Sequence, residues 1–127
     1  MIREITFNFQ LSTNMTEIKV IDIGDFSITF YGGPEGFLNE CRVIIALYDK
    51  SGKTVGFMKF YNEGTEIKAD GFDENNLFNI NFPSGQYLNI TDTLRSRRPL
   101  QLWFDGKVGM LMENKFPPSP PKGINMN

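Results

Sequence analysis

Residues 100–113 limit the possible folds of this chain most strongly, because they predict a β-hairpin with two apolar faces. Asp105-Gly106 is a strong signal for a two-residue type I′ turn, which needs positive φ at both positions. In that register Phe104 pairs with Lys107, and the faces of the hairpin follow from strand alternation. One face then carries Leu100, Leu102, Phe104 and Leu111, and the other carries Trp103, Val108, Met110 and Met112.

Both faces of such a hairpin require cover, because a hairpin with one solvated face should alternate apolar and polar residues. We expect one face to pack on the core. The other is covered either by a helix of the same chain or by another chain. Because Met and Trp are enriched at interface cores, we interpret Trp103, Val108, Met110 and Met112 as a candidate interface. A two-fold symmetric homodimer is the expected assembly.

A single helix is predicted just before this hairpin, at about residues 85–97. Pro83 ends the preceding strand because it lacks a backbone donor, and Ser84 is a suitable helix N-cap. Pro99 disfavours helical geometry at the residue before it, which places the helix end near residue 97. The apolar side chains that share one helix face are Tyr87, Ile90 and Leu94.

The rest of the chain predicts strands separated by turns. Residues 5–11 alternate apolar and polar, which is typical of a half-buried strand. Gly24-Asp25 predicts a type II′ hairpin between residues 17–23 and 26–31. Two further strands are predicted at residues 65–70 and 77–82, separated by a polar loop.

Residues 41–48 read CRVIIALY, a nearly continuous apolar run that predicts a central strand. The next four residues, 49–52, have the composition of a type I turn, with Asp first and Gly fourth. Residues 53–61 are then expected to return as the paired strand. The side chains predicted to form the core are Cys41, Val43, Ile45, Leu47, Met58 and Phe60.

These patterns predict a mainly β fold, either all-β or α+β. We expect an antiparallel β-sandwich or barrel of about 8–9 strands with a single helix, and the short loops favour a meander. At 127 residues, one β-rich domain is expected over residues 1–115. Residues 116–127 contain four prolines and two PxxP registers, and they predict an extended tail.

The chain contains no histidine and one cysteine, Cys41, so histidine-dependent catalysis and a cysteine-only zinc site within one chain are excluded. Cys41 lies in an apolar run and is expected to be a buried, inert thiol. The oxygen-rich residues 70–76 match no EF-hand loop and are interpreted as a solvated turn. We therefore expect no catalytic residues, no cofactor and no metal site, and a protein that is not an enzyme.

Arg95, Arg97 and Arg98 form the basic cluster of the chain. Arginines bind phosphate or carboxylate in a bidentate fork, although cations are also favoured in the last helical turn for their effect on the helix dipole. The cluster supports an alternative function, a small-ligand-binding β-barrel or simple enzyme. In it an arginine would hold an acidic ligand group, and Phe and Met would line an apolar cavity.

The net charge of −2 argues against a general nucleic-acid or anionic-membrane binder. Charges in the first ten residues argue against a secretory signal, and no apolar run approaches the length of a transmembrane helix. We expect a cytoplasmic protein. The expected function is a non-catalytic protein-interaction or assembly module that forms a homodimer, with a different protein partner as a second possibility.

Overall fold

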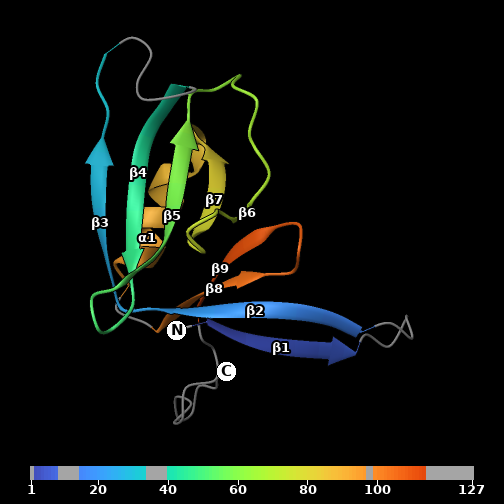
Figure 1. Cartoon of the computed structure of the whole chain (residues 1–127). Helices are drawn as coiled ribbons and strands as arrows, with labels where there is room; N and C mark the ends of the chain where they lie inside the picture. Colours follow the sequence, from blue (N-terminus) through green and yellow to red (C-terminus); the bar gives the residue numbers. More distant parts are fainter. Residues whose placement is uncertain (1, 9–14, 34–39, 97–98, 114–127) are drawn as a thin grey trace, which may run out of the picture.

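The computed structural model of the chain describes residues 2–8, 15–33, 40–96 and 99–113. Two sheets contribute to one core, and the fold is mainly β, as predicted (Figure 1). In spatial order, sheet A contains β1 (Ile2–Asn8), β2 (Met15–Ile23), β8 (Leu100–Phe104) and β9 (Gly109–Glu113). Sheet B contains β3 (Asp25–Phe30), β4 (Cys41–Tyr48), β5 (Thr54–Tyr61), β7 (Phe78–Pro83) and β6 (Gly71–Phe72). The helical part consists of η2 (Ser84–Gln86) and α1 (Tyr87–Leu94). Within the described residues, neither helical segment is long and apolar enough to cross a membrane.

The core lies between the inner faces of the two sheets. Strand β4 is buried at every second residue, and the turn after it is closed by a hydrogen bond from Gly52 N to Asp49 O of 3.0 Å. Of the six side chains predicted for the core from residues 41–61, five belong to the core cluster. Cys41 is buried too, but it lies outside that cluster, beside a register shift between Cys41 and Val43. Sheet A contributes Ile21, Leu100 and Leu102 to the same core cluster.

The predicted antiparallel meander is wrong in sheet B, because β5 and β7 are parallel. A parallel pair needs a crossover connection of about a dozen residues or more, and residues 62–77 supply it. The two sheets do not close into a barrel, so a ligand site in a barrel interior is not available in this fold. Residues 65–70 were predicted as a strand but do not form one. On the side of β7 opposite β5, the described pairing is with the short strand β6.

The predicted hairpin at Gly24 is also wrong. Strand β2 pairs with β1 and β8, whereas β3 pairs with β4, so the chain passes from one sheet to the other at this residue. Gly24 lacks the positive φ that a type II′ turn requires. Instead its N–H donates to Tyr48 O at 2.7 Å, and a Cβ at Gly24 would lie 2.7 Å from Lys50 N. Glycine is needed here because two backbones pack closely together.

The β8–β9 hairpin forms as predicted, but its register is shifted by two residues. Phe104 pairs with Gly109 instead of Lys107, and the Asp105 side chain accepts hydrogen bonds from the N–H groups of Lys107 and Val108. A shift of two preserves the faces, because strand side chains alternate with a period of two. The core-facing side chains are the predicted Leu100, Leu102, Phe104 and Leu111.

The helix is shorter than predicted, with α1 ending at Leu94, and it uses the predicted face. Leu94 belongs to the core cluster, and Tyr87 and Ile90 pack against it. The predicted N-cap at Ser84 is wrong, since no side-chain cap bond forms there. Instead the Glu63 carboxylate accepts hydrogen bonds from Ser84 Oγ at 3.2 Å and Gly85 N at 3.0 Å. A residue distant in sequence therefore satisfies this helix start.

Strands β7 and β9 approach each other closely where the two sheets meet. A Cβ at Gly109 would lie 2.6 Å from Ile80 Cγ1 and 2.8 Å from a ring carbon of Phe78. Both of those side chains are fully buried in the core cluster, so they have little room to move. The side chain at position 109 is therefore restricted to a hydrogen atom.

We predict that Gly109→Ala destabilises the fold by about 1–3 kcal/mol, because the added methyl overpacks the core. Urea unfolding measures the loss. Gly71→Ala is the matched control, since a Cβ at Gly71 meets nothing within 4 Å and should change stability by about 0.5 kcal/mol or less. Combining Gly109→Ala with Ile80→Val, which removes one contacting atom, should cost less than the sum of the two changes. An additive result would contradict the proposed clash.

Three aspartates stabilise turns by the same arrangement. Asp49, Asp73 and Asp105 each accept two backbone N–H hydrogen bonds from residues two to four positions later. A carboxylate binds such donors best when it is ionised. Hydrogen bonds, first from the Ser51 hydroxyl and then from Lys53 N–H, lower the pKa of Asp49 from 3.8 to about 2.

We predict that Asp49→Asn lowers the melting temperature near neutral pH. Because the folded-state pKa lies below the ordinary value, ionised Asp49 stabilises the fold above about pH 4. This contribution disappears as the pH falls through 2, so wild type and variant should converge there. Melting curves between pH 7 and 2 measure the difference. Exposed Glu66→Gln is the control and should not reproduce this convergence. A gap between wild type and Asp49→Asn that does not change with pH would refute the role of the charge.

Candidate functional site

The outer face of sheet A is the first candidate site. We define it by Ile18, Val20, Trp103, Met110 and Met112, which face away from the core cluster. Val20 is the Cα partner of Trp103 and is fully buried, whereas Trp103, Met110 and Met112 are half-buried. The structure therefore brings together three of the four predicted interface residues and adds two apolar residues of β2 that the hairpin pattern did not identify.

A short polar chain borders this apolar surface. Trp103 Nε1 donates to Gln101 Oε1 at 3.0 Å, and Gln101 Nε2 donates to Asp22 Oδ1 at 2.9 Å. The indole N–H is thus satisfied, and the ring contributes apolar area to the outer face of sheet A. Because α1 turns its apolar side toward the core cluster, that side does not cover Trp103.

Two other predictions have different outcomes. Val108 lies in the hairpin loop rather than on the outer face of sheet A, and its exposed fraction is 54 %. The two-residue register shift explains this correction. Arg95 is the exposed C-cap of α1, while Arg97 and Arg98 lie outside the described residues, as does the proline-rich tail. The arginine cluster is therefore not established as a site.

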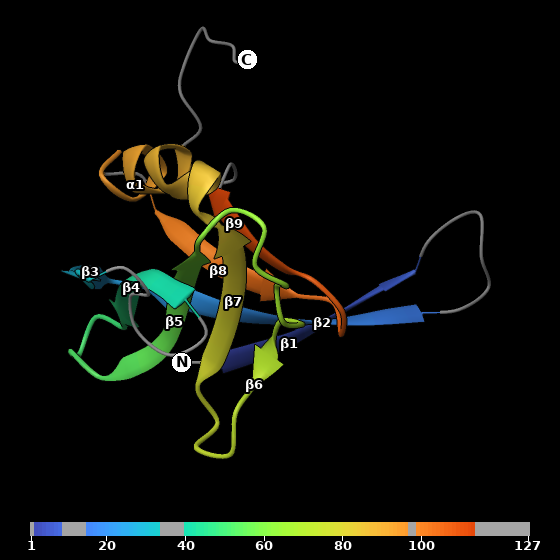
Figure 2. The same ribbon diagram turned by 90° about the horizontal axis from the view of Figure 1, so that it is seen from above.

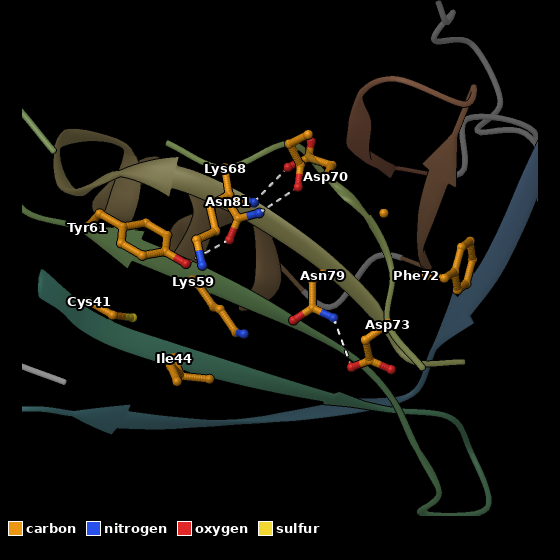
Figure 3. A pocket seen from close by; sticks show the side chains of 12 residues that line it. Cys41, Ile44, Lys59, Tyr61, Lys68, Asp70, Phe72, Asp73, Asn79 and Asn81 are labelled. Atoms are coloured by element: carbon orange, nitrogen blue, oxygen red, sulfur yellow. Dashed lines mark hydrogen bonds between the residues drawn. The ribbon is translucent and has the colours of Figure 1, made fainter. Parts of the chain in front are cut away.

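The Lys59 groove is a second candidate site, on the outer face of sheet B (Figure 3). Its volume is about 470 Å³. The floor comes from β4, β5 and β7, and residues 68–73 form one wall. The residues on which the argument depends are Ile44, Lys59, Tyr61, Lys68, Asn79 and Asn81.

Two amides order the polar side of the Lys59 groove. Asn81 Oδ1 accepts from the Tyr61 hydroxyl at 2.9 Å, and Asn81 Nδ2 donates to Ala69 O at 3.1 Å. Asn79 Nδ2 donates to both Asp73 Oδ2 and Leu77 O at 3.1 Å. Figure 3 shows Lys59 extending into the groove between Ile44 and Asn79.

Asp70 joins the two sheets at the edge of this groove. Its Oδ1 accepts from Asn81 N on β7, and its Oδ2 accepts from Gly109 N on β9, both at 2.8 Å. The predicted strand at residues 65–70 is replaced here by a segment whose Asp70 side chain bonds to β7 and β9. Beyond β6, the backbone N–H of Asn81 on β7 donates to this side-chain carboxylate rather than to the carbonyl of a neighbouring strand.

Cys41 also borders the Lys59 groove and is 2 % exposed, as predicted for a buried thiol. Its Sγ–H donates to Val43 O at 3.4 Å. Burial raises the pKa of the Cys41 thiol, and burial likewise raises the pKa of Tyr61 beside it. Both groups are thus held neutral, which disfavours a thiolate nucleophile.

Sequence reasoning missed the Lys59 groove because its residues lie on four segments that only the sheet order brings together. One signal was present, since Lys59, Asn79 and Asn81 interrupt otherwise apolar strands.

Among the described residues, no group of three or more Cys, Asp or Glu side chains is arranged to hold a metal ion. The chain matches no protein-family model, no curated protein and no solved structure.

We predict that Asp70→Asn destabilises the fold by about 1–3 kcal/mol, because an amide offers one acceptor oxygen where two N–H groups need one each. Hydrogen exchange followed by NMR should show faster exchange at Asn81 or Gly109. Asp92→Asn on the exposed side of α1 is the control and should leave both amides unchanged. Unchanged exchange at both amides in Asp70→Asn would contradict the bridging role.

Proposed function

We propose that this protein is a non-catalytic module that self-associates through the outer face of sheet A. The observation that carries the proposal is the apolar face itself, where Trp103, Met110 and Met112 lie together on the side of the sheet opposite the core. Trp and Met are enriched at the centres of interfaces, and Met adapts to irregular partner surfaces. A second copy of the chain is the partner that such a self-complementary face would bind.

The β1–β2 ribbon supports the same proposal. Within β2, residues 19–23 pair with β8, whereas residues 15–21 pair with β1. The far part of the ribbon therefore extends beyond β8, and both views show it projecting (Figure 2). A two-stranded ribbon is only marginally stable alone in water. A second copy packed on the outer face of sheet A would stabilise this arm.

An interface on sheet A would be organised around its apolar centre. A specific interface buries about 800 Å² on each partner and involves roughly 20–30 residues a side. Trp103, Met110 and Met112 would form its centre, with Ile18 and Val20 of β2 beside them. The Asp22–Gln101 hydrogen bond would lie toward the polar rim.

The non-catalytic part of the proposal depends on the side chains available. The sequence has no histidine, and its one cysteine is buried with its thiol bonded to Val43 O. The carboxylates of Asp49, Asp73 and Asp105 accept turn N–H groups, and Asp70 bridges the sheets. Because these carboxylates are hydrogen-bonded to backbone N–H groups of the fold, binding is better supported than catalysis as the role of this protein.

We predict a wild-type dimer that dissociates when charge is placed on the outer face of sheet A. Light scattering over a concentration series should show Trp103→Glu raising the dimer Kd by roughly 30-fold or more, the effect expected of an interface hot spot. Met112→Lys provides a second test if Trp103→Glu fails to fold, which circular dichroism would show. Val108→Lys in the same hairpin is the matched control and should remain dimeric. A wild type that is monomeric at every concentration would overturn the proposal.

A further inference from the structure

The Lys59 groove has both a charged and an apolar side. Ile44 is the Cα partner of Lys59 across β4 and β5, so their side chains lie beside each other on the outer face of sheet B. Ile44 is half-buried, and the buried Cys41 lies farther along the same groove. Asn81 and Asn79 follow along β7 on the opposite side (Figure 3). A ligand in this groove would contact the apolar side chain of Ile44 and the amides of Asn79 and Asn81.

The acidic residues around Lys59 are already engaged by other groups. Asp70 uses its two oxygens for the N–H groups of Asn81 and Gly109. Asp73 Oδ1 accepts from the backbone, and its Oδ2 accepts from Asn79. The hydrogen bond from Leu77 N–H is the main cause of the lowered pKa of Asp73, and the charge of Lys59 is a minor cause. Neither carboxylate is therefore a dedicated partner for the lysine.

Lys59 is half-buried, and the structure gives its ammonium no hydrogen bond or ion pair to any residue that it describes. Lys68 on the groove wall is exposed, and the structure likewise gives its ammonium no hydrogen bond or ion pair to a described residue. A partly desolvated ammonium is stabilised by an anion that accepts its protons. Tyr61 cannot donate to that anion, because its hydroxyl proton is bonded to Asn81.

We propose that the Lys59 groove binds a small organic carboxylate. The carboxylate would pair with Lys59 and Lys68, and the apolar body of the ligand would pack on Ile44. One N–H of Asn81 Nδ2 beyond its bond to Ala69 O supplies a further donor, and Asn79 Oδ1 supplies an acceptor. Charged and apolar contacts together favour an organic acid over a simple inorganic anion, which would leave the apolar floor uncovered.

The test is a titration with benzoate followed by the backbone amide signals in two-dimensional ¹⁵N–¹H NMR. We expect saturable shifts at Lys59, Asn79 and Asn81, and at least tenfold weaker binding by Lys59→Gln, which keeps most of the aliphatic stem. Lys53→Gln in the exposed 49–53 turn is the matched control and should bind benzoate as the wild type does. The spectrum before titration shows whether each variant is folded.

Two further probes separate the parts of the proposal. Benzamide has the shape of benzoate without its charge and should bind at least tenfold more weakly, and inorganic phosphate should also bind more weakly than benzoate. Equal affinity of wild type and Lys59→Gln for benzoate, or no saturable shifts, would overturn the site. Stronger binding of phosphate than of benzoate would contradict the proposed apolar contact between the ligand and Ile44. Because the groove lies on sheet B, Met112→Lys should not alter benzoate binding, so this test is independent of the dimer.

Discussion

The contact between β7 and β9 is the constraint on which the rest of the structure depends. At this point the two sheets are joined both by packing and by hydrogen bonds, because Gly109 lies against Ile80 while its N–H donates to Asp70. Asp70 is held in turn by Asn81 N on β7. The contact sets how sheet A lies against sheet B, and hence which side chains of each sheet face the shared core.

Both candidate binding surfaces follow from this arrangement. The inner faces of the two sheets are used by the core cluster, and α1 adds Leu94 to the same cluster. The outer faces are what remain, and they differ in character. Sheet A presents Trp103 and two methionines, which suit a protein surface, whereas sheet B presents Lys59 beside amides in a groove, which suits a small polar ligand. The two proposals therefore concern separate surfaces and separate kinds of partner.

Much of the local structure was predictable because it depends on nearby residues. The strand at residues 41–48, the turn after it and the apolar face of the helix follow from alternation, turn composition and helical spacing. The two faces of the β8–β9 hairpin were predicted correctly although the register was wrong, because a shift of two residues returns every side chain to the same side. The error at Gly24 had a different cause. Glycine suits both a tight turn and a close backbone contact, and the local pattern does not distinguish them.

By itself the sequence determined the mainly β character of the chain, the strand faces of residues 41–61 and 100–113, and the exclusion of histidine chemistry. Only the tertiary structure decided the order of strands, the parallel pairing of β5 with β7, and the division into two sheets at Gly24. It also decided that Lys59, Lys68 and Asn79 share one groove. The physical reason is that alternation records which side of a strand is buried, whereas strand order depends on contacts between residues far apart in the chain.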